Sequence, residues 1–90
     1  MSSFSWDPIR EYENMCKHGI DFCFAEKAFS DPRRKIFIDK FHSGREDRYF
    51  CIGKIGNEVV TVRFTVREGK IRIFGAGLWR KGKKIYEKKE

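Results

Sequence analysis

Apolar and polar positions at the start of the chain predict a helix that begins at Asp7-Pro8. An aspartate at the N-cap accepts hydrogen bonds from the free amides of the first turn, and proline fits the first helical position without loss. The helix should run from Pro8 to about Lys17. Gly19 then supplies the left-handed residue that commonly ends a helix.

A second short helix is predicted after Asp21, which can serve as its N-cap. It should stop before Pro32, because the residue preceding a proline disfavours helical angles. Its apolar side chains recur at helical spacing: Phe22, Ala25 and Phe29.

The pattern changes after Pro32 to four short strands followed by a basic tail. The strands should lie at about 35–39, 48–54, 58–66 and 70–76. The short breaks between them favour antiparallel pairing. These breaks contain turn-forming pairs: Ser43-Gly44, Gly56-Asn57 and Glu68-Gly69. With a final helix expected around 83–89, the order predicts an α+β domain: two short N-terminal helices, a four-stranded antiparallel sheet and a basic C-terminal helix.

The third strand alternates most clearly between apolar and polar side chains, which is typical of a strand with one buried face. The side chains expected to face the core are Val60, Val62, Phe64 and Val66. The opposite face carries Thr61, Arg63 and Thr65. In the fourth strand, Arg72 should share this polar face if Ile71 and Ile73 fill the core.

Composition adds a strong positive charge to this picture. Ninety residues make one domain at most. Twenty Lys and Arg against 13 Asp and Glu give a formal net charge of +7. Such a surplus draws polyanions, so nucleic acid or an acidic protein partner is favoured over a purely solubilising role. The sequence contains no P-loop, dinucleotide fingerprint or hydrolase nucleophile elbow.

Three cysteines without C-x-x-C spacing argue against a disulfide framework or a zinc site. Cys16, Cys23 and Cys51 are expected to be small buried hydrophobes, as suits a reducing cytoplasm. The N-terminus does not resemble a signal peptide, and no apolar stretch approaches the roughly 20 residues that span a bilayer. We therefore expect a cytoplasmic protein with no membrane association, metal or cofactor.

Several arginines are expected on the polar face of the sheet. Guanidinium groups bind phosphate in bidentate fashion and can stabilise a pentavalent phosphoryl transition state. The arginines concerned are Arg48, Arg63, Arg67 and Arg72. The alternative is a solvated face on which they pair with acidic side chains: Asp39, Glu46 and Glu58. Alternation alone does not separate these two readings.

A candidate proton-transfer group spans the turn between the first two strands, with the spacing Asp39-x-x-His42-x-x-x-Glu46-x-Arg48. Histidine moves a proton near neutral pH, and a carboxylate can act as a base or orient the imidazole. Such a group would suit RNA cleavage, in which a base removes the proton of the 2′-hydroxyl and an acid protonates the leaving oxygen. A histidine in a polar loop is, however, usually a solvated side chain. His18, at a helix end, is expected to interact with free carbonyls there.

Basic residues alternate with aromatic ones in the C-terminal segment. Such a pattern can grip phosphates and stack the bases of RNA. The residues expected to do so are Trp79, Arg80, Lys81, Lys84 and Tyr86. The two aromatic side chains could instead pack onto the sheet, as is expected for Ile85.

Taken together, these motifs resemble the BrnT family of toxins over nearly the whole chain. The family's opening signature W-D…N…K-H-G-I-x-F is matched by Trp6-Asp7, Arg10, Asn14, Lys17-His18-Gly19-Ile20, Phe22 and Ala25. The middle is matched by Phe29-x-Asp31-Pro32, Asp39-x-x-His42, Glu46-x-Arg48 and Gly53. The C-terminal third is matched by Arg72-Ile73-Phe74 and Tyr86.

The resemblance implies a RelE-like fold and a metal-independent endoribonuclease that blocks translation. It also implies a BrnA-type antitoxin with a ribbon-helix-helix DNA-binding region, through which the complex reaches operator DNA. RelE-like sites often rely on clustered basic residues. We therefore expect Arg48, Arg63 and Arg72 to be catalytic, with His42 and Glu46 contributing proton transfer or orientation. The expected RNA-binding residues are Arg67, Trp79, Arg80, Lys81, Lys84 and Tyr86.

Two positions depart from the family. It commonly has S-A-R where this chain has Gly75-Ala76-Gly77, and Lys83 replaces an acidic residue. An expected arginine is thus missing at position 77, although Arg80 or Lys81 could supply its charge. A basic module that binds the antitoxin or RNA without cleaving it is the alternative function. A direct DNA-binding regulator is a third, for which no recognition helix stands out.

Overall fold

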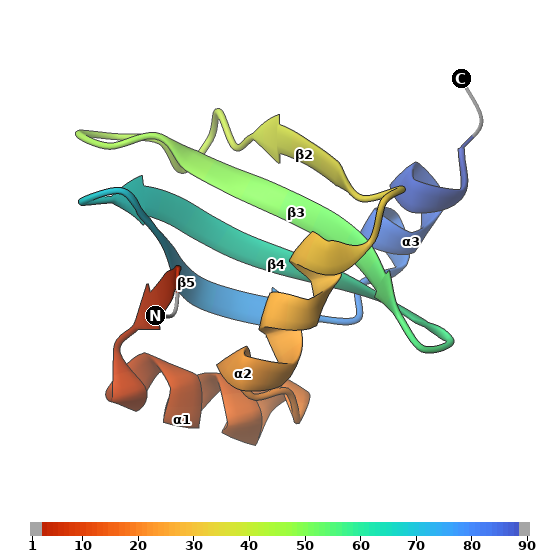
Figure 1. The fold of residues 1–90 in the computed structure, drawn as a ribbon, viewed down its shortest axis with the longest axis horizontal. Helices are drawn as coiled ribbons and strands as arrows, with labels where there is room; N and C mark the ends of the chain where they lie inside the picture. The colour runs from red at the N-terminus through yellow and green to blue at the C-terminus, as the bar shows by residue number, and fades with distance from the viewer. Residues whose placement is uncertain (1–2, 89–90) are drawn as a thin grey trace.

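The molecule is built around one mixed sheet (Figure 1). The structure is a computed structural model that describes residues 3–88. The strands lie in the order β1-β5-β4-β3-β2. Helices lie between the first two strands and after the last one, which confirms the α+β class. The elements are β1 (Phe4–Trp6), α1 (Pro8–His18), α2 (Phe22–Ala25), the 3-10 helix η1 (Glu26–Ser30), β2 (Lys35–Ile38), β3 (Arg48–Ile55), β4 (Glu58–Arg67), β5 (Lys70–Gly77) and α3 (Arg80–Glu87).

The sheet corrects the prediction of four antiparallel strands. Strands β2 to β5 do pair antiparallel, with bounds close to those expected. The fifth strand, β1, pairs parallel with β5, so that Ser5 lies opposite Arg72. Three residues are too few to show strand periodicity, and their partner lies far along the chain. Local sequence patterns therefore could not identify this strand.

The predicted helix starts are confirmed by the caps. Asp7 Oδ1 accepts from the amide of Ile9 at 2.9 Å, and Gly19 ends α1 with φ of 71°. Asp21 Oδ1 accepts from the amide of Phe24 at 2.7 Å. The second helical segment continues beyond α2 as η1 and ends before Pro32, as expected.

Helix α3 begins at Arg80, earlier than the predicted start at position 83. Gly82 lies within it and is buried against β4, where an added Cβ would clash with Thr61 Oγ1. The glycine thus permits close approach of helix and sheet and does not break the helix. Lys89, at the end of the predicted helix, lies outside the described residues.

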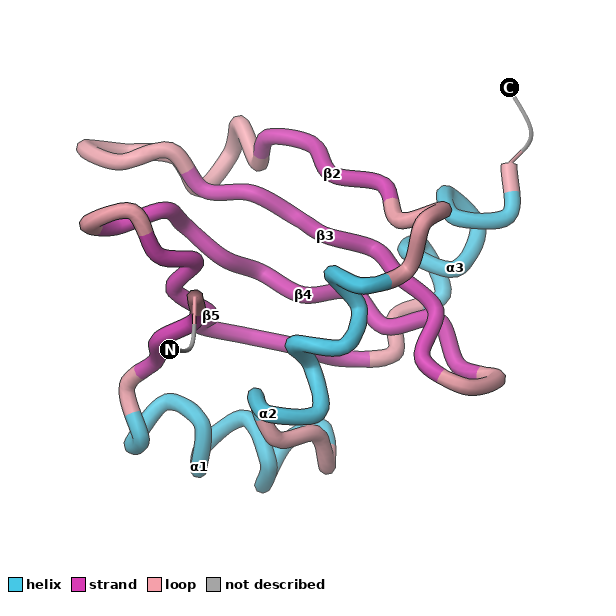
Figure 2. Tube along the Cα trace, in the orientation of Figure 1, coloured by secondary structure: helices cyan, strands magenta, loops and turns pink. Residues whose placement is uncertain are grey.

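The two faces of the sheet are covered by different elements. Segments α1, α2 and η1 cover the core face, where Phe22, Val62 and Phe64 are buried. Helix α3 packs on the opposite face, over β3 and β4. Figure 2 shows α1 beside β5, and α3 near the end of the sheet where β3 turns into β4. Four side chains of β4 were predicted to face the core. The prediction is wrong for Val66, which is 56% exposed because it lies beyond the helices that cover the sheet.

The cysteine prediction holds only for Cys51, which is buried; burial raises the pKa of its thiol to about 12. Cys16 and Cys23 are exposed, so the prediction was wrong for both, because each lies on the outward side of its helix. Within residues 3–88, no helix is both long and apolar enough to cross a membrane.

Candidate functional site

Strand register brings arginines from distant parts of the sequence to one end of the sheet. Arg48 in β3 pairs with Thr65 in β4, and Thr65 pairs with Arg72 in β5, so all three share the face opposite the core. A cavity of about 200 Å³ opens there, which we call the arginine pocket. It is lined by Asp7, Arg10, Glu46, Arg48, Thr65, Arg67, Arg72, Ile73 and Phe74.

Arg63 lies next to this pocket, stacked between aromatic rings. Its guanidinium carbon is 5.5 Å from the Phe74 ring centroid and 5.9 Å from that of Trp79. The guanidinium of Arg48 lies over the same Phe74 ring at 4.8 Å. Gly75 makes room for Arg63, because an added Cβ would lie 2.6 Å from Nη2. Two guanidinium groups thus contact the ring of Phe74, a favourable interaction that also limits their motion.

A β-bulge in β5 produces this arrangement. Phe64 pairs with Ile73, whereas Arg63 pairs with Gly75, so Phe74 is the extra residue. The bulge places Phe74 next to the arginines and returns Ala76 to the core, opposite Val62. The sequence carries no sign of the bulge except the glycine that follows it.

The arginine cluster holds more positive charge than its carboxylates balance. Burial lowers the pKa of Arg63, Asp39 acts to raise it, and neighbouring Arg48 and Arg10 lower it further. Arg63 Nε is buried and has no hydrogen-bond partner among the described residues. Among residues 3–88, no acidic side chain forms an ion pair with Arg48, Arg63 or Arg72. The arrangement is therefore suited to receiving an anion from outside the chain.

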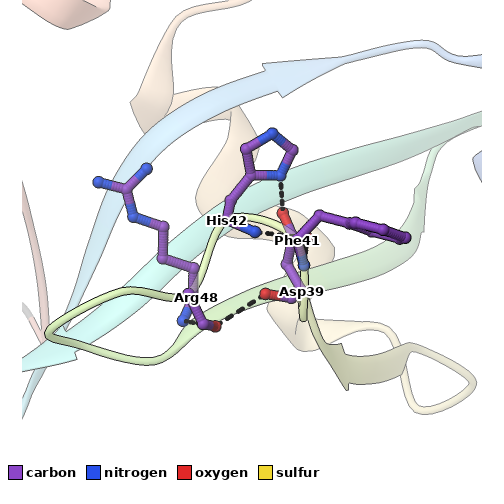
Figure 3. Close-up of polar contacts among 5 residues, drawn as sticks. Asp39, Phe41, His42 and Arg48 are labelled. Carbon is purple, nitrogen blue, oxygen red and sulfur yellow. Dashed lines mark hydrogen bonds and ion pairs between the residues drawn. The ribbon is translucent and has the colours of Figure 1, made fainter.

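His42 is held in the loop before β3 by the buried carboxylate of Asp39 (Figure 3). Asp39 Oδ2 lies 2.7 Å from His42 Nδ1, and Oδ1 accepts from the backbone amides of Phe41 and His42. The Asp39 amide donates to the Arg48 carbonyl at 2.7 Å, which closes the loop. The His42 and Arg48 side chains project on the same side, with Phe41 directed away.

This contact fixes the orientation of the imidazole. When Nδ1 donates to Asp39, Nε2 is left as the proton acceptor. The His42 side chain is 61% exposed, so a substrate can reach it. His42 does not line the arginine pocket but belongs to the loop that carries Glu46 into it.

Glu46 forms the ion pair of the pocket, with Arg67 Nη2 at 3.1 and 3.2 Å from its two oxygens. Both side chains are substantially exposed, so the pair adds little stability. The predicted solvated-face pairings involved Asp39, Glu46 and Glu58. Of these, the described ion pairs include only Glu46 with Arg67 and Asp39 with His42, which leaves the three inner arginines unpaired.

The C-terminal residues predicted to bind RNA fall into separate groups. Trp79 lies beside Arg63, and its ring packs edge-on against His18 at 5.0 Å between centroids. Tyr86 lies away from the arginines and donates a 2.5 Å hydrogen bond to Asp31 Oδ2. That bond, followed by burial, raises the pKa of Tyr86. The remaining residues are exposed on α3: Arg80, Lys81 and Lys84.

The ring of Trp79 lies against Gly77, the position at which the resemblance led us to expect an arginine. An added Cβ on Gly77 would lie 2.7 Å from Trp79 Cη2. The indole therefore occupies the space where a side chain at position 77 would begin. A large side chain at position 77 and Trp79 in this position exclude each other.

Two residues of the site were missed by sequence reasoning about function. Arg10 reaches the pocket because β1 delivers the start of α1 to the end of β5 that carries Arg72. Phe74 reaches it through the bulge. Arg10 was noticed only as part of a motif, and its spacing of three residues from the Asp7 cap gave no indication of an arginine partner across the sheet.

The described residues, 3–88, contain no group of three or more His, Cys, Asp or Glu side chains placed to hold a metal ion. The fold and the cluster together define a small basic α+β domain with an arginine-lined pocket. The family model described as "Ribonuclease toxin, BrnT, of type II toxin-antitoxin system" matches residues 6–82 of the 90. The chain therefore belongs to the BrnT family of ribonuclease toxins. The comparison with curated proteins gives no match.

Proposed function

We propose that this chain is a cytoplasmic endoribonuclease that cleaves RNA in a RelE-like manner and so blocks translation. The observation that carries the proposal is the cluster of Arg48, Arg63 and Arg72, which has no acidic ion-pair partner in residues 3–88. It lies at an open pocket beside a carboxylate-oriented histidine. Family membership supports ribonuclease activity in general.

The proposed reaction uses the RNA's own 2′-hydroxyl and needs no metal. The 2′-oxygen attacks the adjacent phosphorus, the bond to the 5′-oxygen breaks, and a 2′,3′-cyclic phosphate remains. A base removes the 2′ proton, and an acid returns a proton to the departing 5′-oxygen. Arg48, Arg63 and Arg72 bind the phosphate and stabilise the extra negative charge of the pentavalent transition state.

His42 is the proposed proton carrier, because Asp39 holds Nδ1 and leaves Nε2 exposed. Glu46 holds Arg67 in the pocket and has an orienting role. On the exposed face of α3, Arg80, Lys81 and Lys84 would attract the RNA strand beyond the reacting phosphate. We retain Trp79 as an RNA contact. We assign Tyr86 a tethering role, because Asp31 already engages its hydroxyl.

Expression of the free chain in bacteria tests this function directly. Wild-type protein should arrest growth, whereas the double variant Arg63→Ala, Arg72→Ala should relieve the arrest, since it removes two of the three inner guanidinium groups. The matched control is Arg33→Ala, Arg34→Ala, which removes the same charge from two exposed positions outside the pocket. Full toxicity of the Arg63/Arg72 double variant at equal protein level would refute the site.

A second candidate function is a basic module that binds RNA or the antitoxin without cleaving it. The observation in its favour is that Trp79 covers position 77, where the resemblance led us to expect an arginine. Purified chain that retains RNA but leaves several RNA substrates intact at protein excess would establish this alternative. Appearance of 2′,3′-cyclic phosphate ends under the same conditions would establish cleavage.

We further propose that the partner is a BrnA-type antitoxin with a ribbon-helix-helix region, and that operator DNA is bound only through the complex. Membership of a type II toxin family supports an antitoxin partner in general. The net charge of +7 suits an acidic one. A neighbouring reading frame encoding a ribbon-helix-helix protein, and silencing of the toxin when both are expressed, are the expected findings. A gel shift of the operator by the free chain alone would contradict them.

A further inference from the structure

A second cavity lies on the same face of the sheet as the arginine pocket, between the sheet and α3. Its volume is about 260 Å³, slightly below the range of about 300–1,000 Å³ that accommodates drug-sized ligands. Its walls are mostly apolar, with aromatic rings from β2, β3 and the start of α3. We call it the aromatic slot; it is lined by Phe37, Phe50, Ile52, Thr61, Trp79, Lys81, Gly82 and Ile85.

Two buried side-chain atoms at this slot and its margin lack hydrogen-bond partners. They are Thr61 Oγ1 and Arg63 Nε, the two such atoms found among residues 3–88. Thr61 is 5% exposed and lines the slot. Buried polar groups in native proteins are nearly always paired, because leaving one unpaired costs free energy. Both atoms lie on β4 and face the same side of the sheet.

Arg63 connects the slot to the arginine pocket. Its guanidinium stacks on Phe74, which lines the pocket, and on Trp79, which lines the slot. Phe50 of the slot is its direct cross-strand neighbour on β3. A cationic phosphate site and an aromatic cavity therefore share one side chain between them.

We propose that the aromatic slot binds one nucleobase of the RNA whose phosphate occupies the arginine pocket. The proposal rests on the proposed function, because it assumes that the pocket binds RNA phosphate. Aromatic rings provide stacking for a base. Docking of an apolar side chain from a protein partner would make no use of the adjacent arginine pocket, so the geometry favours the base.

The test compares two short oligonucleotides that cannot be cut because every 2′-hydroxyl is methylated. One carries bases, and the other has the same backbone without them. Wild-type chain should bind the base-bearing strand about tenfold more tightly, the effect expected of one stacked base. Phe37→Ala should reduce this preference severalfold while leaving affinity for the abasic strand unchanged, since Phe37 is 37% exposed on an edge strand and its loss should spare the fold.

The matched control is Ile36→Ala, because Ile36 is the next residue on β2, is similarly exposed, and does not line the slot. It should retain the full preference. Arg72→Gln should weaken binding of both strands alike, because it removes a phosphate contact. The comparison of the two strands with wild-type chain needs no variant, so it tests base binding even if Phe37→Ala unfolds.

Equal wild-type affinity for the two strands would overturn the slot while leaving the proposed phosphate site intact. Failure of wild-type chain to bind either strand would overturn the proposed function and the slot with it. If Phe37→Ala weakens antitoxin binding but preserves base preference, the slot is a protein-docking site and the proposal is wrong.

Discussion

At the scale of single residues, Gly77 shows how one side chain can determine which others a site can hold. The Trp79 indole lies where a Cβ at position 77 would point. Arg63 in turn stacks on that indole and over Gly75. A substitution at Gly75 or Gly77 should therefore change the position of Arg63 in the arginine cluster. Gly77 and Trp79 are thus coupled through packing, and Arg63 is coupled to both.

We expect Gly77→Ala to destabilise the protein by about 1–3 kcal/mol, the usual cost of overpacking a tight site. The added Cβ would lie 2.7 Å from Trp79 Cη2, so the ring must shift. Urea unfolding measures the change. Gly44→Ala is the control, because a Cβ there meets nothing within 4 Å. If Gly77→Ala is as stable as wild type, the ring is not held over position 77.

At the scale of elements, Asn14 fastens α1 to the edge of β5 that β1 leaves unpaired, at the buried residue Ala76. Its Nδ2 donates to the carbonyls of Ile20 and Ala76, both at 2.9 Å. Its Oδ1 accepts from the Ala76 amide at 3.1 Å. The side-chain amide thus satisfies the Ala76 backbone groups that a neighbouring strand would otherwise pair. Asn14 consequently has a structural role at the sheet edge.

Replacing Asn14 with alanine should destabilise the fold by about 2–3 kcal/mol, because buried backbone groups lose their partners. Asn14 is 6% exposed, so water cannot readily replace the amide. Glu13→Ala, an exposed neighbour on α1, should change stability little. The free energy of unfolding in urea distinguishes them. Equal stability of the two variants would contradict the role of Asn14 as a tether.

A second tether joins α3 to the segment after η1 through Tyr86 and Asp31. Burial acts to raise the pKa of Asp31, but hydrogen bonds from Tyr86 and from the amides of Lys54 and Arg33 outweigh it and lower the pKa below its ordinary value. The same contact raises the pKa of Tyr86. The tether therefore depends on an ionised carboxylate and a neutral phenol.

The pH dependence follows from these two directions. A lowered carboxylate pKa gives stability that is present above the ordinary value of 3.8 and lost as pH falls through the folded pKa. A raised phenol pKa gives stability that is present below the ordinary value of 10.0 and lost as pH rises through the folded pKa. Tyr86→Phe should therefore be less stable than wild type near neutral pH, with the difference shrinking at both extremes.

Urea unfolding at acidic, neutral and alkaline pH measures this effect. Tyr12→Phe is the control, because Tyr12 is 70% exposed and its loss should leave stability unchanged across the range. A stability difference for Tyr86→Phe that does not vary with pH would show that the hydroxyl's contact with Asp31 is not the cause.

At the scale of the whole molecule, the net charge of +7 predicts strongly salt-dependent binding of RNA. For single strands, the logarithm of affinity falls with the logarithm of salt at a slope of about −0.7 for each phosphate neutralised. Arg72→Gln should therefore make the slope shallower by about 0.7. Arg33→Gln, outside the pocket, should leave it nearly unchanged. Fluorescence anisotropy with the uncleavable oligonucleotide measures both, and equal slopes would argue against a phosphate contact at Arg72.

The sequence alone predicted the features that depend on neighbouring residues. Asp7, Asp21 and Gly19 cap helices through contacts within one turn. Alternation in β4 and β5 placed Arg63 and Arg72 on one face, and the structure brings both to the arginine cluster. The Asp39-x-x-His42 spacing also yielded a real contact, because it lies within one tight loop.

Only the tertiary structure decided which side chains complete the site. Parallel pairing of β1 with β5 brought Arg10 to the pocket, and the bulge brought Phe74. The docking of α3 placed Trp79 over Gly77 and formed the aromatic slot. These arrangements depend on how strands and helices pack against one another, and no local pattern reveals that packing. The sequence showed which types of side chain are present, but only the fold brings them together around the arginine pocket.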